Sequence, residues 1–419
     1  MVRRVAGDPL YRGSLVLLTN TAALSALGLV FWTLAARTYP AATVGSFSGL
    51  TSGINLLAAV AALGLPNVIT RHLSRTPNPL GLMAISLAAI TALGGSLCAI
   101  AILVLGPHLP ATLHLQQHGR IVYLVTVLVI GTALSGAIDA GLVAVRATQA
   151  VLWTNLAGAV ARLVAVCLLT SLRSSGLVAA FSLGLILATL LSALCLAARV
   201  AAGERRAASS RPRRGHLTAA ARMYLGTILG ILPSTVVPLE VLAARGAAQT
   251  APFAVSFLVA GFLNFIPSTT SQVLFAEASR RGTHISSQLP KALRTSYLLV
   301  IPALVIVMAG APLVMRIFGA SYAAQATGCL RVLALSAIFT SGSYLVDSLL
   351  IARDRTGAYV FMNGANAALV LGCVYALVPR GLTGAAVGWA LAQAGSLLLG
   401  LTVLAVGGTG RHRSQGRSP

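Results

Sequence analysis

The sequence has few charged residues and very few acidic ones. Only 9% of its 419 residues are charged, Asp and Glu together number 7, and 57% of the residues are hydrophobic. A soluble protein of this size needs far more charge on its surface, so a soluble globular fold is excluded. Instead, apolar runs of about 20 residues recur, and each can cross a bilayer core of about 30 Å as a helix.

Motifs of enzymes and metal sites are also missing. There is no nucleotide-binding motif, no pair of catalytic carboxylates and no nucleophile constellation, so we predict that the protein is not an enzyme and has no cofactor. The 5 cysteines show no CxxC spacing and are interpreted as apolar packing residues. His108, His114 and His118 cluster in one loop, but no nearby acid completes a metal site.

The apolar runs predict an all-α polytopic membrane protein. We expect twelve transmembrane helices in two parallel six-helix repeats around a central cavity. The first run is too long for the apolar region of a signal peptide and is interpreted as a retained helix. The predicted spans are about 13–36, 43–66, 80–106, 121–145, 151–171, 177–200, 220–244, 251–276, 296–317, 328–351, 356–378 and 382–407.

The net charge of +23 is distributed asymmetrically about these spans. If both termini are cytoplasmic, most Lys and Arg residues fall on the cytoplasmic side, which is typical of a multi-pass protein of the cell membrane. The basic loops are then expected to contact anionic headgroups of membrane lipids. Nucleic-acid binding is not expected, because the basic stretches lack both a fold and interleaved aromatic residues. The basic residues that do not fall on the cytoplasmic side are of two kinds. Two lie in or at the edge of spans, Arg162 and Arg331, and six are expected outside: Arg37, Arg120, Arg173, Arg245, Arg316 and Arg380.

Several landmarks repeat at one offset along the chain. Asp139 and Asp347 lie 208 residues apart, each followed by an arginine, and the same offset carries Arg37 onto Arg245. This pattern indicates a duplicated membrane unit. We expect a six-helix lobe over 1–200, a basic cytoplasmic linker over 201–219, a second six-helix lobe over 220–410 and a basic cytoplasmic tail over 411–419. Because six is even, the two repeats are expected to be parallel.

Short segments in a conserved order resemble one family of membrane proteins. The chain is similar to the polysaccharide-biosynthesis (O-antigen type) flippases of the multidrug/oligosaccharidyl-lipid/polysaccharide exporter superfamily over nearly its whole length. This resemblance implies movement of a lipid-linked saccharide from the inner to the outer leaflet. The segments that carry it are Leu34–Pro40, Val44–Ser48, Leu63–Pro66 with Arg71, Phe275–Ser279, Ile317–Tyr322 and Gly381–Ala386.

Arg162 is the candidate for binding an anionic diphosphate. It lies near the middle of the fifth span, where a charge costs at least about 2.5–3.5 kcal/mol unless it is compensated. Its planar guanidinium can donate two parallel bonds to phosphate. Two alternatives stay open: pairing with a neighbouring helix, such as with Asp139, or reaching toward the membrane surface. One repeat later the position is Val370.

Asp139 and Asp347 are candidate proton- or cation-coupling residues. Both are predicted to lie close to the cytoplasmic boundary of their spans. The alternative is a structural anchor in which the acid is capped by the arginine that follows it, Arg146 or Arg353.

The seventh span is a candidate gate. Pro233 and Pro238 free backbone carbonyls and are expected to bend this helix. Glu240 is expected to face the cavity or its outer mouth; the alternative is a kinked packing helix with an interfacial acid.

Polar residues inside other spans are candidate saccharide contacts. In this class we place Asn20, Asn264, Ser268, Thr269 and Gln272. Ordinary hydrogen bonding between helices is the alternative for each of them.

These patterns favour a transporter that moves a polyprenyl-diphosphate saccharide by alternating access during cell-surface polysaccharide (lipopolysaccharide) biosynthesis. A polymerase or glycosyltransferases are expected partners. A drug/cation antiporter of the same superfamily and a non-transporting scaffold of a polysaccharide assembly are the alternatives. A membrane glycosyltransferase would need a large outer loop or an acidic catalytic motif, and neither is present.

Overall fold

A computed structural model describes residues 9–73, 76–105, 119–172, 174–202, 215–270, 285–353 and 355–414. These residues form helices and connecting turns, and twelve of the helices are long and apolar enough to cross a membrane. The prediction of an all-α multi-pass membrane protein with twelve spans is therefore confirmed. The chain divides into two compact units, Met1–Arg213 and Arg214–Pro419.

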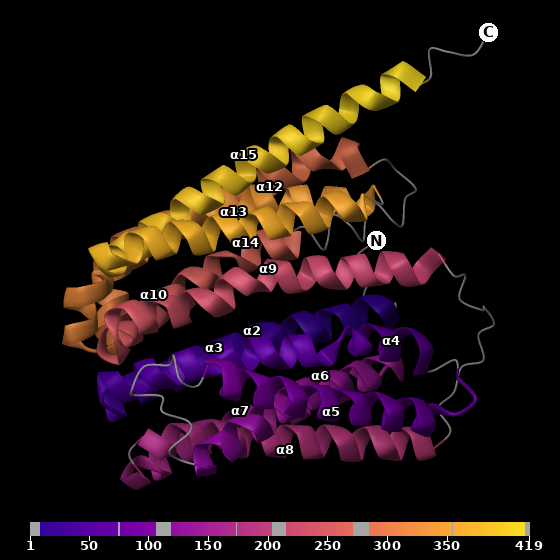
Figure 1. Cartoon of the computed structure of the whole chain (residues 1–419), viewed down its shortest axis with the longest axis vertical. Helices are drawn as coiled ribbons and strands as arrows, with labels where there is room; N and C mark the ends of the chain where they lie inside the picture. Colours follow the sequence, from indigo (N-terminus) through magenta and orange to yellow (C-terminus); the bar gives the residue numbers. More distant parts are fainter. Residues whose placement is uncertain are drawn as a thin grey trace. The chain divides into compact units, whose positions relative to one another are not determined.

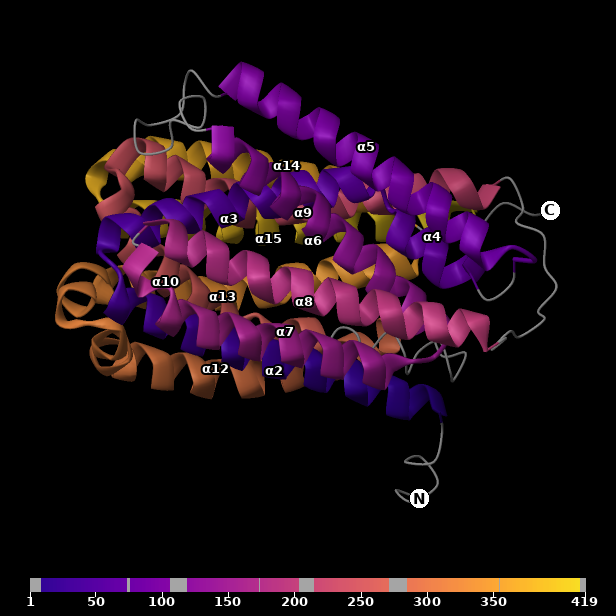
Figure 2. The same cartoon turned by 90° about the horizontal axis from the view of Figure 1, so that it is seen from below.

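The first unit is a bundle of long helices with one short helix and one short turn (Figure 1). Figure 2 shows α7 between α2 and α8, and α7 packs against both. Buried apolar side chains between α3, α5, α6 and α8 form its core. The elements are α2 (Pro9–Thr38), α3 (Ala41–Ala62), α4 (Leu65–His72), α5 (Pro79–Leu105), α6 (Gly119–Ala144), α7 (Thr148–Leu168), η5 (Thr170–Leu172) and α8 (Ser174–Ala201).

The second unit packs α13 against α12 and α15, and α14 against α9 and α15. Its apolar core includes two separate clusters, one between α10, α12 and α13 and the other between α13, α14 and α15. Its elements are α9 (Gly215–Arg245), α10 (Ala247–Leu263), α12 (Ile285–Phe318), α13 (Ala320–Ala352), α14 (Thr356–Leu377), η6 (Val378–Arg380) and α15 (Leu382–Ser414).

The helix boundaries of the two units repeat at the offset found in the sequence. The last residues of α6 and α13, Ala144 and Ala352, are 208 residues apart, as are the first residues of α7 and α14, Thr148 and Thr356. The short turns η5 and η6 and the first residues of α8 and α15 keep the same separation. The predicted duplication is therefore present in the fold.

Some predicted span boundaries are wrong for local backbone reasons. The second span was expected to continue to residue 66, but α3 ends at Ala62 because Leu63 and Gly64 both adopt positive φ angles, 45° and 71°. A separate short helix then begins with Pro66 in its first turn. The eighth span begins earlier than expected, at Ala247, directly after Gly246 with φ 77°.

Close approach of α14 and α15 depends on glycine. A Cβ atom added at Gly388 would lie 2.6 Å from the carbonyl oxygen of Cys373, which belongs to the backbone and cannot move aside easily. In the same helix, a Cβ at Gly395 would meet only Leu369, at an ordinary 3.8 Å. Small residues permit such helix contacts within membranes.

We predict that Gly388→Ala destabilises the second unit by about 1–3 kcal/mol, because the added methyl group forces α14 and α15 apart. The matched control is Gly395→Ala, which is expected to change stability little. Thermal unfolding of the purified protein in detergent measures both. Equal effects of the two substitutions would contradict the proposed packing role of Gly388.

Candidate functional site

An aspartate in the first unit joins three helices. Asp139 of α6 accepts one hydrogen bond of 3.0 Å from the Asn155 Nδ2 of α7 and one of 3.0 Å from the Ser192 Oγ of α8. Ser192 is fully buried, and its Oγ lies 2.8 Å from Thr154 Oγ1. Both carboxylate oxygens are therefore bound by well-formed hydrogen bonds. The predicted alternative that Arg146 caps this acid is wrong.

The second unit repeats the Asp–Asn pair with longer bonds. Asn363 Nδ2 of α14 lies 3.4 Å from each carboxylate oxygen of Asp347 of α13, and it also donates to the Tyr359 carbonyl at 3.0 Å. The Asn residues, like the acids, are 208 positions apart. As in the first unit, the partner of the acid is the asparagine and not the following arginine, here Arg353.

The third member of the first cluster is missing from the second. At the offset of 208, Ser192 corresponds to Gly400 and Thr154 to Met362. A Cβ at Gly400 would meet the side chains of Met362 and Val346 at 3.2 and 3.1 Å, so apolar atoms occupy this region. Asp347 therefore lacks the hydroxyl donor that Asp139 has.

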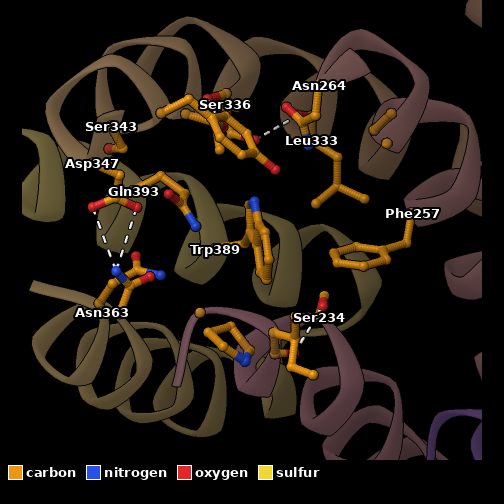
Figure 3. Close-up of a pocket in the computed structure, with 18 of the residues that line it drawn as sticks. Ser234, Phe257, Asn264, Leu333, Ser336, Ser343, Asp347, Asn363, Trp389 and Gln393 are labelled. Carbon is orange, nitrogen blue, oxygen red and sulfur yellow. Dashed lines mark hydrogen bonds between the residues drawn. The ribbon is translucent and has the colours of Figure 1, made fainter. Parts of the chain in front are cut away.

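Asp347 instead lines a pocket inside the second unit (Figure 3). The pocket has a volume of about 430 Å³ and is enclosed by α9, α10, α13, α14 and α15. Figure 3 shows Asp347 and Asn363 on one side, Trp389 in the middle and Phe257 on the other side. The rings of Phe257 and Trp389 lie edge to face, with 4.8 Å between their centres. The polar lining residues are Thr227, Ser234, Asn264, Ser336, Thr340, Ser343, Tyr344, Asp347, Tyr359, Asn363, Asn366, Trp389 and Gln393.

Arg162 lies in the first unit against aromatic rings. Its guanidinium carbon is 4.0 Å from the centre of the Phe181 ring and 5.8 Å from that of Phe31. Its Nε atom is buried and has no hydrogen-bond partner. The alternative of pairing with Asp139 is not seen among the described residues, where the acid accepts hydrogen bonds from Asn155 and Ser192. Cation–π contacts partly compensate the buried charge of Arg162.

Glycines shape the site of Arg162. A Cβ at Gly158 of α7 would lie 2.5 Å from the carbonyl oxygen of Gly184 of α8, and a Cβ at Gly184 would meet the side chain of Arg162 at 2.8 Å. The two backbones therefore approach closely, one turn from the arginine. This contact fixes the stem of Arg162 against α8, where Phe181 lies.

The other predicted site residues do not come together at one place. Pro233 and Asn264 line the pocket of the second unit, whereas Pro238 and Glu240 do not, although Glu240 Oε2 is buried without a partner. Ser268 and Thr269 lie outside the pocket, and Ser268 donates to the carbonyl of Phe265. Asn20 is in α2 of the first unit, where its Oδ1 is buried and unpaired. Gln272 lies outside the described residues, as do His108, His114 and His118.

Sequence reasoning missed most of the pocket. Asn363, Asn366, Trp389 and Gln393 were not among the predicted residues. The offset of 208 pairs Asn363 with Asn155, and this match was a signal that could have found it. Within the described residues, no group of three or more His, Cys, Asp or Glu side chains could hold a metal ion.

No protein-family model matches this sequence, and no curated protein is significantly similar to it. Solved structures of transporters share its fold. A multidrug resistance MATE family transporter of the MOP superfamily matches with a TM-score of 0.70 and 16% identity in its inward-facing conformation, over 94% of this chain and 95% of that chain. Its outward-facing counterpart matches with a TM-score of 0.63 and 17% identity, over 99% and 98%.

A flippase also has this fold. The lipid II flippase MurJ in an inward closed conformation matches with a TM-score of 0.66 and 12% identity, over 92% of this chain and 86% of that chain. At these identities the likeness extends to the fold, which is that of multi-pass membrane transporters.

We predict that Asp139→Ala destabilises the protein more than Asp347→Ala does. Removing Asp139 leaves Asn155 and Ser192 buried without their acceptor, which costs about 1–3 kcal/mol, whereas Asp347 accepts only long bonds next to a pocket. Thermal unfolding of the two purified variants, compared with wild type, measures the difference. A larger loss for Asp347→Ala would show that both acids are structural.

Proposed function

We propose that this protein is a membrane transporter that moves a lipid-linked saccharide from the inner to the outer leaflet of the cell membrane by alternating access. Support comes from its fold, which is shared with a lipid II flippase and with a transporter known in inward- and outward-facing conformations. Its sequence segments also resemble polysaccharide flippases. A polymerase or glycosyltransferases that handle the same saccharide are natural partners.

The observation that carries this proposal is the buried Arg162. Its guanidinium carbon lies over the rings of Phe181 and Phe31, and its Nε has no hydrogen-bond partner among the described residues. The diphosphate head of a polyprenyl-linked saccharide supplies anionic oxygens that can accept hydrogen bonds from this side chain. Arginine suits this role because its planar fork can donate two parallel bonds to a phosphate group.

The prolines of α9 supply the proposed gate. The helix continues through Pro233 and Pro238, although each proline removes one backbone hydrogen bond. A helix weakened at two adjacent turns can bend there with little loss of further bonds. Glu240, whose Oε2 has no partner, lies in the same weakened half of α9.

A second candidate function is cation antiport, which the pocket around Asp347 favours. A carboxylate that is held by one amide at 3.4 Å, and not by a guanidinium, remains able to bind a proton, a metal cation or a cationic solute. In this case Asp347 couples transport to an ion gradient or binds the cargo itself, and Asp139 remains structural.

We predict that Arg162→Gln lowers lipid-linked saccharide transport about tenfold to a hundredfold, because one charged hydrogen-bonding partner of the diphosphate contributes about 1.5–3 kcal/mol. Arg162→Lys is expected to restore part of the activity, since it keeps the charge without the fork. Mass spectrometry of lipid-linked glycans in each leaflet of reconstituted vesicles measures transport. Arg331→Gln, which removes an arginine that donates to the Met308 carbonyl, is the control.

Unchanged transport in a well-folded Arg162→Gln protein would remove this residue from the mechanism. If no lipid-linked saccharide moves in wild-type vesicles while cationic drugs do, the second candidate is correct.

We predict for the second candidate that transport responds to a sodium or proton gradient and that Asp347→Asn abolishes this response. The substitution removes the charge and keeps the size of the side chain, so the pocket stays intact. Transport rates in vesicles with and without each gradient provide the measurement. Rates that are independent of both gradients in the wild type would exclude ion coupling.

A further inference from the structure

Several hydroxyl groups of the pocket in the second unit are left as hydrogen-bond acceptors. Ser336, Thr340 and Ser343 of α13 each donate to a carbonyl of their own helix, at 2.6, 2.8 and 3.3 Å, and Ser234 of α9 does the same at 2.8 Å. Their hydroxyl protons are therefore used, and only lone pairs remain for a ligand.

Two amide oxygens and a carboxylate add to these acceptors. The Oδ1 atoms of Asn264 and Asn366 are buried and have no hydrogen-bond partner within the part of the chain that the structure describes. Asp347 receives only the two long bonds from Asn363. A buried acceptor without a donor costs about 1–3 kcal/mol. The pocket therefore fits a ligand that brings several hydrogen-bond donors.

The spread of the acceptors favours an extended ligand over a compact cation. Ser336 and Asp347 are eleven residues apart on α13, which is roughly 16 Å at the helical rise. A metal ion gathers its oxygen ligands within about 2.6 Å, and an ammonium group carries its donors on one atom. Either one reaches only a few of these acceptors, whereas a saccharide carries its hydroxyl groups on separate carbon atoms.

Aromatic rings and a few donors complete the pocket. Trp389 and Phe257 present an apolar wall, while the indole Nε1 of Trp389 and the amide of Gln393 provide donors. A saccharide has hydroxyl groups around its edge, which both donate and accept, and C–H groups on its faces, which pack on aromatic rings. A volume of about 430 Å³ is also in the range of small-molecule sites.

Some polar residues of this pocket have no polar counterpart in the first unit, although Thr340 and Ser343 correspond to Thr132 and Ser135. At the offset of 208, Asn264, Ser336 and Gln393 correspond to leucines in the first unit, and Asn366 corresponds to Gly158. Shared structural needs of the fold therefore do not require these polar side chains, since the first unit forms without them.

We propose that this pocket binds a saccharide ring, with Trp389 against its face and with Asp347, Asn366 and Gln393 bonded to its hydroxyl groups. For its choice of ligand the inference rests on the proposed transport of a lipid-linked saccharide. It assigns recognition of the sugar to the second unit, whereas Arg162 of the first unit recognises the diphosphate.

Trp389 is the reporter for the test. In a protein with Trp32→Phe and Trp153→Phe, Trp389 is the one remaining tryptophan of the chain. The neutral saccharides to be tested are glucose, galactose, rhamnose and N-acetylglucosamine. We predict that at least one of them changes the fluorescence of Trp389 saturably, with a dissociation constant in the millimolar range. Sodium chloride and tetraphenylphosphonium, which represent the cationic class of ligand, are tested in the same way. Asn366→Leu and Gln393→Leu are each expected to weaken saccharide binding about tenfold, and Ser135→Ala, in the first unit, is the control.

Asp347→Asn separates the two ligand classes. An amide still accepts and donates bonds to hydroxyl groups, so saccharide binding should persist within about tenfold of wild type. Binding of sodium or tetraphenylphosphonium that disappears in Asp347→Asn, with no response to any of the four saccharides, would overturn the inference.

The proposed transport function and the assignment of this pocket can be tested separately. Arg162-dependent transport of a lipid-linked saccharide without saccharide binding at Trp389 would overturn only the pocket assignment. Saccharide binding without such transport would leave the pocket assigned and contradict the flippase function.

Discussion

Within the bilayer, a buried polar side chain must find its hydrogen-bond partner inside the protein, because no water is available to it. In the first unit, Asp139 meets this requirement through Asn155 and Ser192, and the resulting bonds connect α6, α7 and α8. The second unit retains the aspartate and the asparagine but has Gly400 where the serine would be. Asp139 thus has a well-formed bond to each oxygen, whereas Asp347 has only long bonds from one asparagine.

This difference gives the duplicated acids different roles. An acid with a well-formed hydrogen bond to each of its oxygens, from two different helices, is suited to holding helices together. An acid with long bonds beside a pocket can exchange its partner for a ligand at little cost. Apolar packing of Met362 and Val346 near Gly400 stabilises the region where the donor was lost, so the second unit keeps its fold while Asp347 becomes available.

The sequence allowed the membrane class, the twelve spans and the duplication to be predicted, because hydropathy and a constant offset are properties of the chain itself. The site was less predictable. Hydropathy does not show which face of a span a polar residue occupies, so Trp389 and Gln393 could not be distinguished from packing residues. The rings beside Arg162 come from α2 and α8, and contacts between separate helices are not encoded in local spacing. The positive φ angle of Leu63 likewise ended the second span at Ala62, although the apolar sequence continues beyond it.

The breaks in the duplication carry more functional information than the matches. Matched features, such as the turns η5 and η6 and the first residues of the helices that follow them, belong to the architecture that both units share. Arg162 corresponds to Val370, and Asn366 corresponds to Gly158, so each unit has a polar group that the other unit does without. Folding does not demand these groups, and burying them is costly in a membrane. A bound ligand in each unit offsets such a cost, because it supplies the partner that the fold leaves out.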